Sequence, residues 1–324
     1  MPELPDIELY IEALRPRIQN DTLLDIKLGN PFLLRTVTPG VNEFKNRKLT
    51  EIRRIGKRIA LGFDNQHWQV LHLMIAGRLQ WIDTGAKLPA RKSLLSLEFT
   101  SGHLLLTEAG SKRRASLHLF ESETEMLTLD RGGLEVLEIT EDQFRERLQV
   151  RNHTLKRALT DQSLFSGIGN AYSDEILHKA SLSPILQTQK MDDEQITSLH
   201  NSCISTLQHW KRALLEEAGD TFPKKVTAFK KEMAVHGKFG QPCPVCDTKV
   251  QRIRYASNET NYCPRCQTDG KLLADRSLSR LLKKDWPKTI ESLEETDRIH
   301  QSTSQNKNQI TTCLLYTSPS PRDS

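Results

Sequence analysis

Two cysteine pairs with the same spacing constrain the C-terminal part of this 324-residue chain more than any other feature. Cys243 and Cys246 stand in CPVC, Cys263 and Cys266 stand in CPRC, and sixteen residues separate the pairs. This spacing is typical of a tetrahedral zinc site, whereas four unrelated buried cysteines would leave the matching turns unexplained. The alternating residues 251–262 between the pairs predict a hairpin. Because protein fills all four positions, we expect one structural Zn2+ and no open position for catalysis.

Composition sets the broad class of protein. The chain has 46 Lys and Arg, 41 Asp and Glu and a net charge of +5, and its 37% hydrophobic and 27% charged content are those of a folded protein of two ordinary domains. No apolar run approaches the roughly 20 residues that cross a bilayer, and the N-terminus lacks a secretory layout. We therefore expect no membrane partner and a cytoplasmic location. The modest basic excess favours a polyanionic partner only slightly.

Apolar periodicity divides the chain into a β-rich first part and a helical second part. Residues 6–18, DIELYIEALRPRI, have apolar positions on one helical face, and Pro16 should end or kink this helix. Over residues 23–129 short apolar runs alternate with turn residues, which predicts a sandwich or a barrel. Residues 141–217 return to helical periodicity. Residues 218–240 are rich in lysine and poor in apolar residues, so we expect a loop without core positions.

A glycine turn stands between two predicted helices, in LFSGIGNAYSDEIL. Gly167 and Gly169 have no Cβ, so backbone N–H groups can approach an anion closely, and the following helix offers its positive N-terminal end. These features suit a phosphate clamp that Lys156, in HTLKRALTDQ, would join. A plain corner between helices with solvated cations explains the same residues, and the motif alone does not decide between the two.

Three other positions carry cationic or titratable groups next to predicted strands. Lys57, in RIGKRIALGF, stands where a glycine turn opens into an apolar strand, and His72, in HLMIAGRLQW, flanks a strand or turn. Arg254 lies in the predicted zinc hairpin, from which it could reach a phosphate. Taken singly, each is equally a surface, rim or core residue.

The first residues, MPE, are a candidate for covalent chemistry. A small second residue permits removal of the initiator methionine, which frees the Pro2 nitrogen as a secondary amine with a pKa near that of an α-amino group, roughly 7.7 to 8.0. Such an amine attacks a sugar C1′ and yields an iminium that acidifies the adjacent C2′ hydrogen. Glu3 is placed to carry protons to the ring oxygen or from C2′. Taken alone, MPE is usually an ordinary start.

Together these motifs resemble the formamidopyrimidine-DNA glycosylase and endonuclease VIII family of base-excision repair enzymes. MPELPDIE, IGKR, LTDQSLFSGIGNAYSDEIL, CPVC and CPRCQ occur in that family's order and spacing, from Met1 to about Gln267. The resemblance implies an α+β multidomain fold: an N-terminal β-sandwich with one N-terminal helix, a helix-two-turn-helix domain and a C-terminal zinc-finger hairpin. It also implies damaged double-stranded DNA as the partner, held between the two halves of a monomer with the damaged nucleotide flipped out.

The resemblance also assigns segments and site residues. Pro2 becomes the Schiff-base nucleophile, Glu3 the general acid, and Lys57 a further proton donor or phosphate contact. The predicted DNA-binding residues are His72, Arg113, Arg114, Lys156, Gly167, Gly169, Asn170 and Arg254, and the four cysteines are the zinc ligands. The predicted segments are a catalytic domain over 1–130, a linker over 131–138, the helical domain over 139–234, the zinc finger over 235–268, an extension over 269–310 and an artefactual tail over 311–324.

Four departures from the family pattern concern cleavage and substrate choice. The arginine that the family places five residues before the third cysteine is Asn258 here, so δ-elimination does not carry over, and Arg254 is the candidate substitute. SKRRAS has Ala115 in place of an aromatic wedge, and the two arginines before it are the candidates for that role. Residues 74–75 read Met-Ile in place of Gly-Met, and the loop over residues 221–229 is short and rewritten. The preferred damaged base therefore does not carry over.

These residues lead to one principal hypothesis of function and two alternatives. The principal one is a bifunctional DNA glycosylase and AP lyase. A non-catalytic or abasic-site-specific DNA-binding protein would retain the clamp and the zinc finger, but the intact Pro2 and Glu3 argue against it. A zinc-ribbon RNA or ribosome factor would explain the cysteines and the charge but not the β-rich first half.

Overall fold

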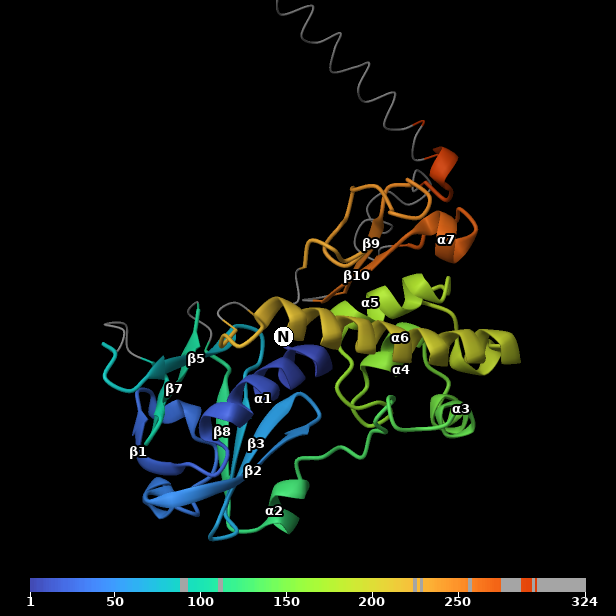
Figure 1. Cartoon of the computed structure of the whole chain (residues 1–324). Helices are drawn as coiled ribbons and strands as arrows, with labels where there is room; N and C mark the ends of the chain where they lie inside the picture. The colour runs from blue at the N-terminus through green and yellow to red at the C-terminus, as the bar shows by residue number, and fades with distance from the viewer. Residues whose placement is uncertain are drawn as a thin grey trace, which may run out of the picture.

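The computed structural model shows an N-terminal sheet domain, a helical domain and a small C-terminal finger in sequence order (Figure 1). The described residues are 1–87, 93–109, 113–223, 226–227, 230–255, 258–274, 287–292 and 295. The side chains of Tyr255 and Asn258, most of the predicted extension and the whole predicted tail over 311–324 lie outside this part of the chain.

Antiparallel strands form the N-terminal domain. They are β1 (Thr22–Leu28), β2 (Arg47–Ile55), β3 (Arg58–Phe63), β4 (Trp68–His72), β5 (Gly77–Asp83), β6 (Leu95–Phe99), β7 (Gly102–Glu108) and β8 (Ser116–Phe120). Their order is β5-β7-β6-β1-β2-β3-β4-β8, and β1 pairs with β2 at two residue positions, so the sheet turns there into two layers. Alternate residues of strands such as β6 are buried between the layers. Of the two predicted all-β forms, the sandwich is the one observed.

Helix α1 (Leu4–Ile18) packs against this sandwich and against the long helix of the second domain. Ile7, Tyr10 and Leu14 are fully buried, which matches the apolar face seen in the sequence. Pro16 does not end the helix, which continues to Ile18. Because Pro16 lies in the last turn, few backbone hydrogen bonds remain after it to be lost.

The second domain consists of helices around a core of its own. Its main helices are α3 (Glu141–Gln149), α4 (Leu155–Thr160), α5 (Asn170–Lys179) and α6 (Asp193–Ala218), and shorter ones in the chain are α2 (Glu123–Leu127), η1 (Pro31–Leu33), η2 (Val41–Phe44) and η3 (Thr188–Lys190). Phe144 stacks on Phe165 in this core, with ring centroids 4.8 Å apart, and Leu4 of α1 joins the same cluster. The first turn of α1 is therefore shared by both domains. Among the described residues, no helix has the length and apolar character that a membrane span requires.

The C-terminal finger contains the predicted hairpin. Strands β9 (Gln251–Tyr255) and β10 (Asn258–Tyr262) pair in antiparallel register, and α7 (Pro264–Thr268) follows. A small core of Val235 and Val250 packs against Cys243 and Cys263. Because this core is so small, the finger depends on its cysteine site for stability.

The prediction that residues 218–240 contain no core positions is wrong at three places. Val226 is buried in the core of the sandwich domain, Met233 in the core of the helical domain and Val235 in the core of the finger. Single apolar residues between lysines form no periodic pattern. Val226, Met233 and Val235 each pack into the core of a different domain, so the periodicity of the sequence could not identify them as buried.

Arg54, on β2, connects the two domains through a set of partly buried partners. Its guanidinium, only 10% exposed, pairs with Glu8 at 2.9 Å and with Glu135, and it donates to the carbonyl of Gly56 at 2.8 Å and to Ser166 Oγ at 3.3 Å. These partners come from α1, from the turn after β2, from the segment that enters the helical domain and from its glycine turn. One side chain thus holds the interdomain contact beside the first turn of α1.

We expect Arg54→Met to lower the free energy of unfolding by about 2–3 kcal/mol, because it leaves the partly buried Glu135 without its cation and Glu8 with Lys211 alone, at 3.2 Å. Arg53→Met is the matched control on the same strand. Arg53 pairs with the exposed Glu123 and lies over the Trp68 ring, so its loss should cost about 1 kcal/mol or less. Urea unfolding measures both values, and equal losses would contradict the interdomain role of Arg54.

Candidate active site and nucleic-acid interface

The Glu3 carboxylate lies at the N-terminal end of α5. It is 2% exposed and accepts three backbone hydrogen bonds, from Gly169 N at 2.7 Å, Ala171 N at 2.8 Å and Tyr172 N at 3.2 Å. The unpaired N–H groups of a helix end are satisfied by such an acceptor, and the helix dipole favours negative charge there. A residue next to the chain start is therefore fixed by the second domain.

The two glycines of the turn make this contact possible. Gly167 has φ +79°, which side chains rarely adopt, and its carbonyl accepts from Leu4 N at 2.9 Å. A Cβ atom at Gly169 would lie 2.5 Å from Glu3 Cδ and 2.7 Å from Lys57 Nζ. The turn thus needs glycine because Leu4, Glu3 and Lys57 approach its backbone.

This geometry corrects the expectation that the backbone N–H groups of the turn would hold a phosphate. At Gly169, Ala171 and Tyr172 they donate to Glu3. The anion at this helix end is a side chain of the protein itself.

Pro2 is buried directly before this contact. The residue ahead of it, Met1, lines both pockets described below together with Lys57. Burial lowers the pKa of the Met1 amino group, and the Glu3 and Asp6 carboxylates oppose that shift. The start of the chain therefore lies where the two pockets meet.

Lys57 stands in the turn between β2 and β3 and closes the same site from the sandwich side. Its side chain is buried at 7% exposure. Burial lowers the pKa of Lys57, the nearby Glu3 opposes the shift, and Lys156 and Arg131 add to it. A buried ammonium next to a carboxylate and two further cations is suited to bind an anion or to donate a proton.

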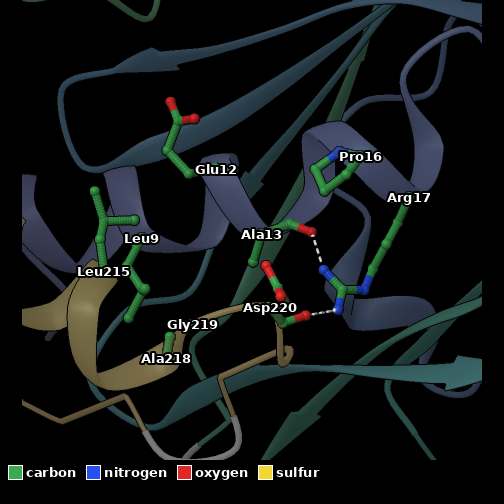
Figure 2. A pocket seen from close by; sticks show the side chains of 9 residues that line it. All are labelled: Leu9, Glu12, Ala13, Pro16, Arg17, Leu215, Ala218, Gly219 and Asp220. Carbon is green, nitrogen blue, oxygen red and sulfur yellow. Dashed lines mark hydrogen bonds between the residues drawn. The ribbon is translucent and has the colours of Figure 1, made fainter.

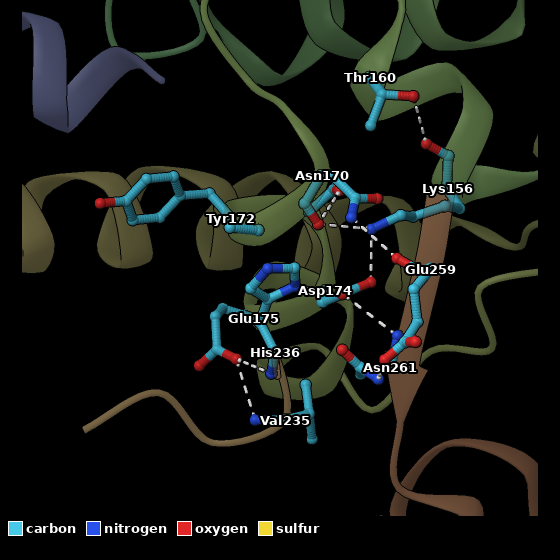
Figure 3. A network of polar contacts seen from close by, with 12 residues as sticks. Lys156, Thr160, Asn170, Tyr172, Asp174, Glu175, Val235, His236, Glu259 and Asn261 are labelled. Carbon is cyan, nitrogen blue, oxygen red and sulfur yellow. Dashed lines mark hydrogen bonds and ion pairs between the residues drawn. The ribbon is translucent and has the colours of Figure 1, made fainter. Parts of the chain in front are cut away.

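The larger pocket of the site has a volume of about 800 Å³ and lies between the two domains and the finger. Its lining includes Met1, Lys57, Lys156, Gly169, Asn170 and Ile253. Lys156 Nζ forms an ion pair with Asp174 and donates to the Asn170 carbonyl at 2.6 Å, and the Asn170 amide donates to the Glu259 carbonyl at 2.8 Å (Figure 3). The structure thus brings together four of the predicted residues: Lys57, Lys156, Gly169 and Asn170.

A second pocket, of about 310 Å³, adjoins the first through Met1 and Lys57 and contains His72. Burial lowers the pKa of His72 to about 4, and Arg58 and Lys57 add to the shift, so the imidazole is neutral near pH 7. Arg58 and Arg131 line this pocket, and the sequence analysis missed both. Arg58 follows Lys57 directly, so the two adjacent cations at the start of a strand could have identified Arg58 as a candidate.

Arg113, Arg114 and Ile75 are exposed. The N–H groups of Arg114 and Ala115 donate to Glu108, and the strand that follows begins at Ser116, which pairs with His72. The segment of Arg113 and Arg114 therefore enters the sheet beside the His72 pocket. The Met74 backbone has φ +52°, a strained value for a residue with a side chain, and Ile75 next to it is 60% exposed.

Arg254 lies on β9 of the finger and is itself paired. Its Nε is 3.4 Å from Glu259, the same carboxylate that Arg252 approaches at 3.3 Å. Arg252 also lies over the Phe239 ring at 4.0 Å. Asn258 opposes Tyr255 in the hairpin register, and its side chain is outside the described residues.

A third hollow lies away from these residues, between α1 and the C-terminal end of α6 (Figure 2). Arg17 bridges its rim by donating to the carbonyls of Ala13 at 2.6 Å and Asp220 at 2.7 Å. None of the predicted site residues lines it.

The four cysteines of the finger form one compact cluster. Their Sγ atoms all lie within 4.8 Å of one another, and three Sγ–Sγ distances are 3.9 Å (Cys243–Cys266), 3.4 Å (Cys246–Cys263) and 3.5 Å (Cys246–Cys266). A tetrahedral Zn2+ with sulfur at about 2.3 Å requires edges of about 3.8 Å, so these residues fit the ion. The structural zinc prediction is confirmed.

His178, on α5, contacts this cluster from outside. Its Nε2 lies 3.3 Å from Cys243 Sγ, and both residues are buried. With a thiolate as acceptor, Nε2 carries the proton and donates it. Such outer partners orient metal ligands, and their loss lowers metal affinity about 10- to 100-fold.

We therefore expect His178→Phe to bind zinc about tenfold more weakly in competition with a chromogenic chelator. His209→Phe, at an exposed histidine on α6, is the control and should match the wild type. Full removal of zinc should unfold the finger while the sandwich persists. Equal zinc affinity in the two variants would rule out the role of His178.

Asp6 supports the start of α1 from a buried position. Its Oδ2 accepts the Glu3 N–H at 3.0 Å, and its Oδ1 has no partner among the described residues. Burial raises the pKa of Asp6 from 3.8 to about 7, and the Glu3 hydrogen bond opposes that shift. Because the folded pKa exceeds the unfolded one, the wild type loses stability through this group as pH rises from about 4 to 7.

Asp6→Asn removes that titration but retains an oxygen that can accept the Glu3 N–H. We expect the free energy of unfolding of the variant, relative to that of the wild type, to increase by about 1–3 kcal/mol as the pH rises from 5 to 8. Urea unfolding at several pH values measures this difference. A stability difference that stays constant with pH would show that Asp6 does not ionise in this range.

Comparisons with known proteins agree with this architecture. Three family models match in order: the formamidopyrimidine-DNA glycosylase N-terminal domain at residues 1–114, the formamidopyrimidine-DNA glycosylase H2TH domain at 135–219, and the zinc finger found in FPG and IleRS at 240–268. Formamidopyrimidine-DNA glycosylase of Chloroflexus aurantiacus is 30% identical over 286 residues, which cover 82% of this chain and 98% of that protein.

Two further relatives extend the comparison. An uncharacterized formamidopyrimidine-DNA glycosylase-like protein of Mycobacterium tuberculosis is 39% identical over 151 residues, covering 47% of this chain and 94% of the relative. The Lactococcus lactis Fpg (MutM) structure with Fapy-dG-containing DNA has a TM-score of 0.71, with 26% identity, and covers 82% of this chain and all of that chain.

The sandwich, the helix-two-turn-helix domain and the cysteine finger define a DNA-repair glycosylase. The chain belongs to the formamidopyrimidine-DNA glycosylase family. Family, fold and zinc site are as predicted from the sequence, and membership supports N-glycosylase activity.

Proposed function

We propose that the chain is a bifunctional DNA glycosylase and AP lyase that removes oxidised bases from double-stranded DNA and nicks the strand by β-elimination. The observation that carries this proposal is the position of Pro2. It precedes a carboxylate fixed by three amides of α5, and Met1, the residue directly before it, lines both pockets together with Lys57.

The chemistry begins once Met1 is removed. The Pro2 nitrogen attacks C1′, the N–C1′ bond forms, the glycosidic bond breaks, and the base leaves with the electron pair and a proton from the site. The amine then loses its proton, and cleavage of the C1′–O4′ bond, with a proton delivered to the ring oxygen, opens the sugar and gives the iminium, which acidifies C2′. Loss of the C2′ proton breaks the C3′–O bond and releases the downstream strand with a 5′-phosphate, and water then hydrolyses the iminium and frees the amine.

Glu3 and Lys57, which both approach Gly169, are proposed to assist these transfers. Glu3 is held against α5, so its carboxylate does not move when it passes a proton to the sugar ring oxygen or takes one from C2′. Lys57, with its pKa lowered by burial, donates a proton or neutralises a phosphate beside the reacting sugar.

The DNA is proposed to bind along the two pockets and the finger. Phosphates would contact Lys156 and Asn170 beside the larger pocket, with Gly167 and Gly169 in the turn behind them, and His72 in the smaller pocket. Arg254 of the finger and the exposed Arg113 and Arg114 would contact the duplex on either side. The solved Lactococcus lactis relative in complex with damaged DNA supports this arrangement.

We further propose that the protein acts as a monomer, since one chain supplies the nucleophile, both pockets and the finger. Its bacterial relatives favour the cytoplasm as the place where it meets DNA. Asn258 in place of the family's arginine favours a reaction that stops after β-elimination, with altered preference among oxidised purines and pyrimidines.

The direct test is borohydride trapping of the untagged protein on a duplex that contains an abasic site. We expect a covalent adduct with the wild type, a loss of at least 100-fold in Pro2→Gly and in a protein with an N-terminal tag, and a loss of about 100-fold or more in Glu3→Gln. Circular dichroism and zinc content control for folding.

The alternative, a non-catalytic abasic-site-binding protein, gives a distinct result in the same experiment. It would bind the abasic duplex without any borohydride-dependent adduct. That outcome with untagged protein, after mass spectrometry has shown Met1 to be absent, would replace the enzymatic proposal.

A further inference from the structure

A carboxylate in the middle of α5 joins three parts of the chain behind the larger pocket. The Asp174 side chain has no exposed surface. It pairs with Lys156 Nζ, accepts from His236 Nδ1 at 2.8 Å and accepts the Asn261 N–H at 3.2 Å (Figure 3). These partners belong to α4, to the start of the finger and to β10.

Burial of this charge has a cost that its partners must offset. A fully buried carboxylate loses several kcal/mol of hydration, and it remains ionised only where a cation and further hydrogen bonds compensate. At Asp174 the cation is Lys156. The partnership is reciprocal, because Lys156, 13% exposed, is held by Asp174 at the pocket wall.

The contacts of Lys156 fix the orientation of its ammonium group relative to the pocket. An ammonium group has three N–H donors. Within the described part of the chain, two of them are directed at Asp174 and at the Asn170 carbonyl. The remaining one is available on the side of the pocket, beside the Asn170 amide.

The same helix holds the finger hairpin next to these two side chains. The Asn170 amide donates to the Glu259 carbonyl on β10, and Asp174, one turn further along α5, accepts the Asn261 N–H of that strand. Lys156, Asn170 and the hairpin are thereby arranged on one surface, and Asp174 contacts two of the three.

We propose that Asp174 is a positioning residue for DNA binding: it holds Lys156 Nζ beside Asn170 and ties the finger hairpin to the same helix, so that all three contact one continuous stretch of the phosphate backbone. This inference rests on the proposed function at the level of DNA binding only. The inference predicts that neutralising Asp174 weakens DNA binding. Simple electrostatics predicts the opposite, since removal of a negative charge near phosphates would strengthen binding.

The neighbouring carboxylate provides a comparison within the same helix. Glu175 accepts the N–H groups of Ala234 at 2.7 Å, Val235 at 2.9 Å and His236 at 2.9 Å. It therefore anchors residues 234–236 at the start of the finger, as Asp174 anchors His236, but within the described part of the chain Lys156 is not among its partners. Variants of Asp174 and Glu175 therefore distinguish the effect of anchoring the finger from the effect of positioning Lys156.

The experiment measures the affinity of the full-length, zinc-loaded protein for a duplex with a tetrahydrofuran abasic analogue, by fluorescence anisotropy over a range of salt concentrations. We expect Asp174→Asn to bind about tenfold more weakly. The slope of log affinity against log salt concentration should also decrease by the amount that corresponds to about one phosphate contact. Lys156→Met should show the same change in slope.

Double variants test the coupling between the two residues. In the Lys156→Met background, Asp174→Asn should lose most of its effect, whereas Glu175→Gln should keep its own effect in full. Full additivity of Asp174→Asn with Lys156→Met would overturn the positioning role. Equal zinc content and equal melting curves are the controls for folding.

The remaining outcomes separate this inference from the proposed function. If the wild type neither binds nor traps DNA, the proposed function fails. If the wild type binds but Asp174→Asn binds equally or more tightly, with an unchanged or steeper salt slope, the inference alone fails. If Asp174→Asn does not fold, the smaller Asp174→Ser carries the same expectation and the same contrary result.

Discussion

The capture of the Glu3 carboxylate by the first turn of α5 is the interaction on which the rest of the site depends. It satisfies the free N–H groups of a helix in the second domain with a side chain from the start of the first. Because Pro2 precedes Glu3, the same contact determines where the Pro2 nitrogen lies. Arg54 and the shared burial of Leu4 hold the two domains together beside it.

Helix α5 serves as the common support for three functions along its length. Its first turn holds Glu3 and, through Asn170, the hairpin; Asp174, one turn further along, holds Lys156 and the hairpin; and its last turn places His178 against a zinc ligand. A helix is a rigid element, so the distances between these groups are set by a single backbone. The proposed catalytic carboxylate, the candidate phosphate ligands and the zinc site are therefore held in a fixed arrangement.

Short-range patterns in the sequence were sufficient for part of this account. The CxxC pairs predicted the zinc ligands because each turn places two thiolates by local geometry, and strand and helix periods separated the two domains. The partners of Glu3 were not predictable, since they lie 166 to 169 residues away in the chain. Gly169 was singled out for a phosphate, yet its backbone is approached by Glu3 and Lys57. Asp174 and Glu175 lie in a stretch of helical periodicity that does not distinguish them from exposed helical charges, and only the tertiary structure shows that they are buried.

The central claim is that the Pro2 nitrogen, placed by Glu3 and α5, is the amine that reacts with DNA. Lys57 is the competing amine, since it is buried at the same site with a lowered pKa. Proteolysis of the borohydride-reduced adduct followed by tandem mass spectrometry identifies the modified nitrogen. We expect the sugar remnant on the N-terminal peptide, at Pro2, with Met1 absent. A remnant on Lys57, or on any other lysine with Pro2 unmodified, would contradict it.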